Sequence, residues 1–266
     1  MAKANIINKA KEELSLENIL MLAIRTPGVK IKRDAFLRKE LRRYCREDVI
    51  EEAIKGNPAK AGISKDLINK VARSVIEYET KKVSGLSVIA SLPSSINAFA
   101  AVGSASADIT SFFAHIIRVV QELAYLYGFP EFNINEEDID SETMNILMVF
   151  IGTMFGVQGA SSMLNKLADN VAKQVAKKLS QKALTKGIVY PIVKDIATKV
   201  GIHMTKQVFA DTVASAIPII GSVASGGLTW VMFKPNCIKL QKSLMSNNLC
   251  DPDFYRNVVD VEVKEI

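Results

Sequence analysis

Three long stretches of this chain contain no charged side chain: residues 83–107, 143–165 and 212–233. Each is longer than the about 20 apolar residues that a helix needs to cross a bilayer. Each is also rich in Gly, Ser or Thr, which a simple membrane anchor does not require. The chain is therefore either a helical protein with an unusually apolar core or a protein that meets a membrane.

The spacing of apolar residues predicts an all-α chain, a multi-helix bundle whose central helices are apolar and rich in small residues. Ile68, Val71 and Val75 recur at the three- and four-residue spacing of one helix face, and Ser64 precedes them as a helix cap. Only residues 257–266 alternate in the manner of a strand, and we expect them to form a loosely held tail. Hydrophobic residues make up 48% of the chain, which excludes disorder as its dominant state.

Two changes of composition along the chain predict that it is divided into three parts. Residues 1–82 form a basic segment of short amphipathic helices, residues 83–245 a helical core, and residues 246–266 an acidic tail. Within the core, Gly128 is expected to end a helix that begins near residue 105. A further helix is expected to run from Ser141 to about residue 184, and Lys234 and Pro235 to close the last uncharged helix.

A basic cluster lies between residues 30 and 46, where eight Lys or Arg residues stand against two acidic ones. Basic clusters suit anionic membrane surfaces, and the alternative is the solvated face of a helix. Few aromatic residues are interleaved with the cluster, so nucleic acid is not the expected partner. The candidate membrane-facing or lipid-facing residues are Lys30, Arg33, Arg38, Arg42 and Arg43.

Small residues recur at four-residue spacing inside the uncharged stretches. Such spacing lets two helix backbones approach closely, which helps most where lipid supplies no hydrophobic drive for packing. The alternative is close packing inside a helical bundle in water. The candidates for helix packing or membrane insertion are Gly152, Gly156, Pro218, Gly221, Gly226 and Gly227.

A polar stripe is expected on the helix that follows residue 105, where Asp108, His115 and Glu122 are spaced by sevens and Arg118 lies between them. Seven residues correspond to about 10 Å of helix rise, too far for neighbouring members to share one metal ion. Pairing of Arg118 with Glu122 is the simpler expectation, and the stripe is then predicted to line a cleft or a seam between helices.

No other pattern predicts a catalytic, metal or cofactor site. His203 has no second His or Cys at ligand spacing, and the chain contains no nucleotide-binding or hydrolase motif. Cys45, Cys237 and Cys250 are widely spaced and odd in number, which indicates free thiols in a reducing compartment. We expect a cytoplasmic protein, peripheral on the inner face of a membrane.

Two segments resemble the EcsC protein family. The first is ASADITSFFAHIIRVVQELAYLYGF, with Asp108, Arg118 and the ending Ala124, Tyr127 and Gly128. The second is KVGIHMTKQVFADTVASAIPIIGSVASGGLTWVMF, in which Ile217 and Pro218 precede Gly-rich small residues. The resemblance covers about residues 80–240 and implies a helical, membrane-associated protein. It implies no catalytic residue, because the biochemical role of the family is not established.

Three functions remain after these observations. The first is a non-enzymatic helical protein that associates with an anionic membrane surface or with a membrane protein. The second is a soluble helical bundle that binds an apolar or acyl ligand. The third is a hydrolase that uses Asp108, His115 or His203.

Overall fold

Every regular element of the computed structural model is a helix within the residues that it describes, which are 16–83, 104–134, 139, 141–177 and 226–257. The prediction of an all-α multi-helix bundle is confirmed. In chain order the helices are α2 (Leu16–Ile24), α3 (Arg33–Leu41), α4 (Glu47–Lys55), α5 (Lys65–Val83), α7 (Ser104–Leu126), α8 (Ser141–Phe155), α9 (Ala160–Ala176), α13 (Gly226–Met245) and the short 3₁₀ helix η3 (Asn248–Cys250).

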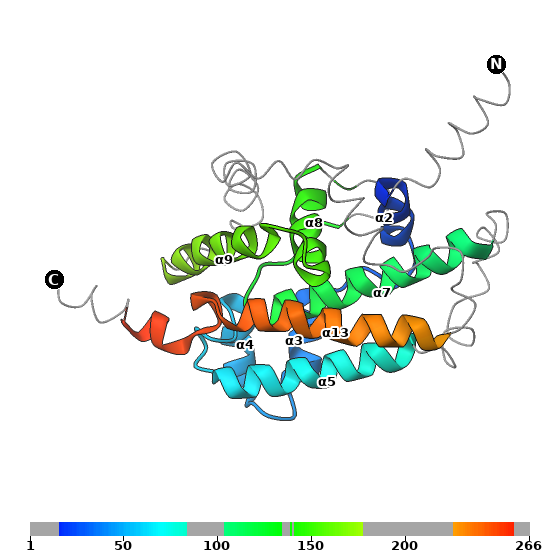
Figure 1. Ribbon diagram of the computed structural model, residues 1–266. Helices are drawn as coiled ribbons and strands as arrows, with labels where there is room; N and C mark the ends of the chain where they lie inside the picture. Colours follow the sequence, from blue (N-terminus) through cyan, green and yellow to red (C-terminus); the bar gives the residue numbers. More distant parts are fainter. Residues whose placement is uncertain (1–15, 84–103, 135–138, 140, 178–225, 258–266) are drawn as a thin grey trace, which may run out of the picture.

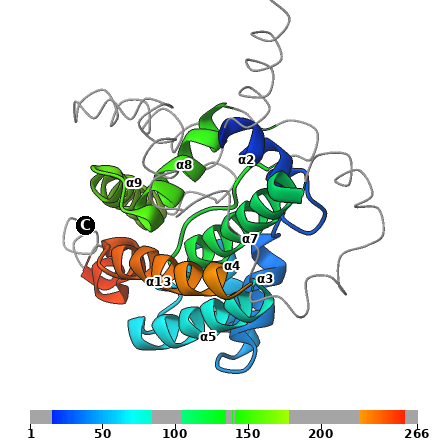
Figure 2. The same ribbon diagram turned by 45° about the vertical axis from the view of Figure 1, so that its right-hand side comes forward.

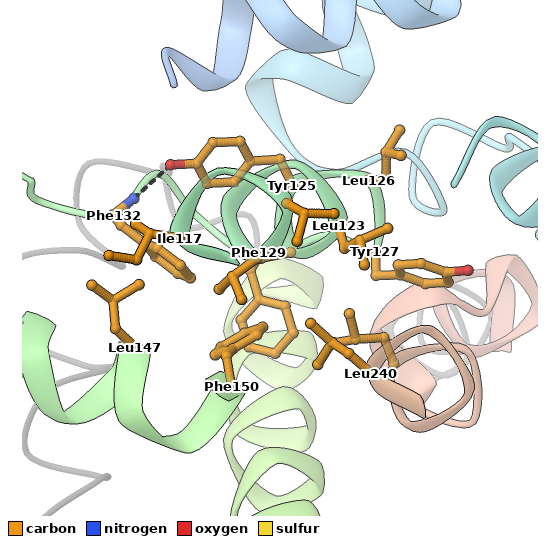
Figure 3. Packing of buried hydrophobic residues seen from close by; sticks show 14 of the residues in the cluster. Ile117, Leu123, Tyr125, Leu126, Tyr127, Phe129, Phe132, Leu147, Phe150 and Leu240 are labelled. Carbon is orange, nitrogen blue, oxygen red and sulfur yellow. Dashed lines mark hydrogen bonds between the residues drawn. The ribbon is translucent and has the colours of Figure 1, made fainter. Parts of the chain in front are cut away.

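Helix α7 lies at the centre of this arrangement. It packs against α2, α3, α5, α8 and α13, and α5, α7 and α13 run alongside one another in both views (Figures 1 and 2). Residues 119–130, which form the last part of α7 and the turn after it, are all buried, because neighbouring helices cover them. Around its C-terminal end Tyr125, Phe129, Phe132 and Phe150 pack edge to face, and the Tyr125 hydroxyl accepts a hydrogen bond from the Phe132 amide at 3.2 Å (Figure 3).

The end of α7 is closed by Gly128, as the sequence predicts. Its φ of +102° is favourable for glycine, and the Phe129 amide bonds back to the carbonyl of Ala124 at 2.9 Å. A Cβ at this position would lie 2.9 Å from Nδ2 of Asn57 and 3.0 Å from Leu249. Gly128 is therefore needed both for the turn and for the close approach of two other segments.

Helix α5 begins where the sequence predicts, since the Leu67 amide donates to Oγ of Ser64 at 3.3 Å. The preceding turn contains Asn57, which is fully buried. Its Nδ2 donates to the Tyr255 hydroxyl at 2.7 Å and to the Leu249 carbonyl at 3.2 Å. The turn before α5 is therefore tied to the C-terminal segment of the described chain.

These contacts change the three-part division. Helices α2 to α5 share one hydrophobic core with α7, α8, α9 and α13, so residues 16–82 are not separate from the part that follows. Leu249, Cys250 and Tyr255 are also buried in that core. The first part of the predicted acidic tail, up to residue 255, therefore packs with the helical core.

The second uncharged stretch does not form one continuous helix. Helix α8 ends at Phe155 and α9 begins at Ala160, because Gly156 and Gly159 adopt φ values of +75° and +82°. The expected helix from Ser141 to about residue 184 is therefore wrong at this break. The two pieces pack against each other and place Leu147, Phe150 and most of their apolar residues in the core.

Pro235 does not close the last uncharged helix as expected. It is exposed within α13, which continues to Met245. Phe233, Cys237, Leu240 and Leu244 recur on one buried face, and packing of this face against α5 and α8 outweighs the hydrogen bond that the proline removes. In the described residues, none of the helices combines the length and the apolar character that crossing a membrane requires.

Candidate anion-binding site

The polar stripe of α7 faces α5, where it meets Glu79. Nδ1 of His115 lies 3.4 Å from Oε2 of Glu79, and Nη2 of Arg118 lies 3.6 Å from its Oε1. Lys82 places its ammonium 3.0 Å from the same Oε1, and Arg118 also lies 3.4 Å from Oε1 of Glu122. The expected pairing of Arg118 with Glu122 is confirmed, and these residues line a seam between two helices.

Arg118 also joins this seam to the turn between α2 and α3. Its Nη1 donates a hydrogen bond to the backbone carbonyl of Gly28. Asp108, the remaining member of the predicted stripe, lies near the start of α7, where only the backbone is described. His203 lies outside the described residues.

Glu79 was missed by the sequence analysis, although a signal for it exists. It lies on the apolar face of α5, at helical spacing from Val75, Ile76 and Val83, and its exposed fraction is 0%. A carboxylate at such a position needs cationic partners, because an unpaired buried charge is strongly unfavourable. Burial by itself raises the pKa of Glu79, but the hydrogen bond from His115 and the positive charges of its neighbours outweigh burial and lower the pKa.

Glu122 has the opposite environment. Burial raises the pKa of its carboxyl to about 8, and the negative charge of Glu79 adds to the rise, while Arg118 and Lys82 offset part of it. At neutral pH Glu79 therefore carries the negative charge in the seam, and Glu122 is protonated. Oε2 of Glu122 is buried and has no hydrogen-bond partner among the described atoms.

A pocket of about 260 Å³ lies between α3 and α5 and reaches Glu122. The lining residues from α3 and the turn after it are mostly charged, those from α5 are apolar or hydroxylic, and α7 contributes Glu122. The lining consists of Lys39, Glu40, Arg42, Arg43, Tyr44, Val71, Ser74, Val75, Tyr78 and Glu122. It is smaller than the about 300–1,000 Å³ of sites that enclose drug-sized ligands, so its size suits a small polar group.

Two tyrosines flank this pocket at the surface. Tyr44 is 43% exposed and Tyr78 is 54% exposed. The Lys70 ammonium lies 5.2 Å from the centre of the Tyr44 ring, and the ammonium groups of Lys39 and Lys82 lie 5.6 Å and 4.3 Å from the centre of the Tyr78 ring. We call these two tyrosines and three lysines, together with Arg42 and Arg43, the basic-aromatic face.

The residues of the predicted basic cluster have different surroundings. Lys30 is exposed, and Arg38 pairs with Glu47 and with Glu51 on α4. Arg42 and Arg43 are exposed and have no ion-pair partner within the described ranges. These two guanidinium groups therefore leave their charge free at the pocket.

Arg33 differs from the rest of the cluster because it is 3% exposed. Its guanidinium donates to the carbonyls of Ile54 at 2.8 Å, Gly56 at 3.0 Å, Ala53 at 3.2 Å and Phe129 at 3.0 Å. These carbonyls lie at or just beyond the ends of α4 and α7, where helices leave acceptors unsatisfied. Burial lowers the pKa of Arg33 to about 10, so the group stays charged at neutral pH. Its prediction as a lipid-facing residue is wrong.

The small-residue candidates fall into three groups. Gly152 is buried in α8, whereas Gly156 is exposed and ends that helix, so the prediction of Gly156 as a helix-packing residue is wrong. Gly226 and Gly227 are the first two residues of α13. Pro218 and Gly221 lie outside the described residues.

Within the residues whose side chains are described, no group of three His, Cys, Asp or Glu residues is arranged to hold a metal ion. Cys45, Cys237 and Cys250 are free thiols, and the last two are buried. A second pocket of about 410 Å³ lies along α4 and the turn after it, with Asp48, Glu51 and Glu52 in its lining. It is open to solvent and contains no buried unpartnered group of the kind found at Glu122.

Comparisons with protein-family models, with curated proteins and with solved structures found no match. The resemblance of residues 105–129 and 199–233 to the EcsC family stays a prediction, and the function is argued from the site alone.

Proposed function

We propose that this protein binds the anionic surface of a membrane, on its inner face, through the basic-aromatic face. The observation that carries the proposal is that Arg42 and Arg43, which have no ion-pair partner among the described residues, line the same pocket as the exposed rings of Tyr44 and Tyr78. Tyrosine side chains favour the headgroup level of a bilayer, because the ring is apolar and the hydroxyl is polar. Lys and Arg near an anionic surface each contribute about 1 kcal/mol.

The charges of this face are arranged to act outward. Lys39 is paired with Glu40 at 2.8 Å, so its attraction for an external anion is reduced. Lys82 is likewise paired with Glu79 at 3.0 Å. Arg42 and Arg43 have no such neighbour among the described residues, and Lys70 lies over the ring of Tyr44, which does not cancel its charge. The face therefore presents a net positive charge around two aromatic groups.

The alternative functions receive less support from the geometry. An acyl chain needs an apolar cavity, whereas the pocket between α3 and α5 is small and lined by four charged residues and the carboxyl of Glu122. A hydrolase needs a base that reaches its substrate, but the described contacts of the His115 ring are with Glu79 in the helix seam, and His115 does not line the pocket.

The test is co-sedimentation with vesicles of phosphatidylcholine that contain about a third phosphatidylserine. Charge reversal of both Arg42 and Arg43 to Glu removes two attractive charges and adds two repulsive ones. We expect vesicle binding to weaken by at least about 30-fold at low salt, and the wild-type binding to weaken as salt rises.

A matched control carries the same change of net charge on another surface. Lys166 and Lys173 are exposed on α9, which packs against α8, α13 and η3 and lies across the molecule from α5 in both views (Figures 1 and 2). Reversal of these two lysines to Glu should leave most of the binding intact. Equal loss in both double variants would mean that net charge alone drives binding, and no loss at Arg42 and Arg43 would overturn the proposal.

A further inference from the structure

One side chain of the pocket is not explained by attraction to a membrane surface alone. Glu122 is 6% exposed, lines the pocket together with Arg42 and Arg43, and leaves Oε2 without a hydrogen-bond partner among the described atoms. Buried polar atoms in folded proteins are almost always hydrogen-bonded, so Oε2 of Glu122 calls for a partner such as a water molecule or a ligand atom. A group that enters between α3 and α5 can supply the missing partner.

Charged and titratable groups from three helices surround Glu122. Helix α5 contributes Glu79 and Lys82, and α7 contributes His115 and Arg118. From α3 and the turn after it come the Lys39–Glu40 pair and the guanidinium groups of Arg42 and Arg43. Because the pKa of Glu122 is raised to about 8, its carboxyl is protonated at neutral pH and is able to donate a hydrogen bond.

We infer that this pocket binds a terminal phosphate monoester, whose charge is paired by Arg42 and Arg43 and whose oxygen accepts a hydrogen bond from Oε2 of Glu122. The inference rests on the proposed membrane function and names the headgroup chemistry that the same face selects. Two guanidinium groups match the charge of a phosphate monoester, which is between −1.5 and −2 at neutral pH. A phosphodiester or a carboxylate carries a single charge and has fewer free oxygens for three donors.

The first measurement compares vesicles that contain phosphatidic acid, a phosphate monoester, with vesicles that contain phosphatidylserine, adjusted to the same surface potential. We expect the wild-type protein to bind phosphatidic acid at least about tenfold more tightly. The preference should be lost in Glu122→Ala and kept in Glu122→Gln, because the Gln amide still donates a hydrogen bond. Retention of the preference in Glu122→Ala would overturn the role of Glu122.

The pH dependence separates Glu122 from a general effect of charge. As the pH rises through about 8, Glu122 ionises and repels the phosphate, so the wild-type preference for phosphatidic acid should decrease. Glu122→Gln cannot ionise, and its preference should stay constant over the same range. The titration of the lipid is common to both proteins, so equal pH profiles would overturn the inference. Thermal unfolding of each variant shows that it is folded.

A second measurement uses inorganic phosphate alone, titrated into the full chain by calorimetry, with the same variants. Equal binding of the two vesicle types, lost in the Arg42 and Arg43 double reversal, overturns the phosphate pocket and leaves the membrane proposal standing. Binding of inorganic phosphate that depends on Glu122, without binding to either vesicle, supports the pocket with a free phosphate as its ligand and overturns the membrane proposal. Absence of binding in every experiment overturns both.

Discussion

Replacement of Arg33 by Met tests the claim that this arginine stabilises the fold and does not contact lipid. Methionine keeps an unbranched apolar stem of similar length but removes the four donors to the carbonyls of Ala53, Ile54, Gly56 and Phe129. Hydrogen bonds to a charged group contribute about 1.5 kcal/mol or more each, which gives about 6 kcal/mol for four.

Burial of the charge offsets part of that stabilisation. The decrease of the Arg33 pKa from 12.5 to about 10 corresponds to roughly 3 kcal/mol of unfavourable desolvation, which the variant does not incur. The net loss expected for Arg33→Met is therefore about 3 kcal/mol in the free energy of unfolding. At about 2–4 °C per kcal/mol, Tm should fall by roughly 6–12 °C.

The assay is equilibrium unfolding in urea, followed by circular dichroism at a helical wavelength. Arg43→Met is the matched control, because Arg43 is exposed and has no ion-pair partner in the described part of the chain. We expect its free energy of unfolding to change by less than about 0.5 kcal/mol. A loss in Arg33→Met no larger than that in Arg43→Met would refute the reasoning, as would reduced vesicle binding by an Arg33→Met protein that is fully folded.

Three further outcomes follow from the structure. Because Glu122 has a raised pKa in the folded state, its contribution to the free energy of unfolding is present in full below about pH 4.5 and decreases as the pH rises to about 8. Unfolding in urea between pH 5 and 8 should show this decrease in the wild type and not in Glu122→Gln. Gly128→Ala introduces a Cβ at a φ of +102° and 2.9 Å from Nδ2 of Asn57, so it should cost about 2 kcal/mol or more, measured by thermal unfolding against Gly62→Ala, where the new Cβ meets nothing within 4 Å. Asn57→Ala removes the amide that donates hydrogen bonds to the Tyr255 hydroxyl and the Leu249 carbonyl. Hydrogen exchange should then accelerate in residues 249–257 while α7 stays protected, and unchanged exchange in residues 249–257 would contradict the role of Asn57 in holding this segment.

Local signals in the sequence predicted helix ends better than they predicted helix continuity. Ser64 and Gly128 act at the ends of α5 and α7 through groups within five residues, so their roles could be predicted from the sequence. Gly156 looked like an ordinary small residue of a long helix, since its positive φ depends on how α9 packs back against α8. Pro235 looked like a stop, but packing on both sides of it keeps α13 continuous.

The candidate site was predictable only in part, and for the same reason. His115, Arg118 and Glu122 share one face of α7 because of their spacing, and Glu79 could have been found as a carboxylate within the apolar face of α5. The pairing of the two faces could not be predicted, because 36 residues separate Glu79 from His115 along the chain. The role of Arg33 had no local signal, since one of its acceptors lies 96 residues away.

The contact between Asn57 and the C-terminal segment also has a consequence for biosynthesis. Asn57 is buried among partners that lie 192 and 198 residues later in the chain, and α13, which covers α5, begins only at Gly226. While the ribosome is still making the middle of the protein, the apolar face of α5 and the Asn57 amide have not met these partners. Folding of the first helices can therefore be completed only after Leu249 and Tyr255 have been synthesised, and a nascent chain that stops before Leu249 exposes apolar surface of the kind that chaperones bind.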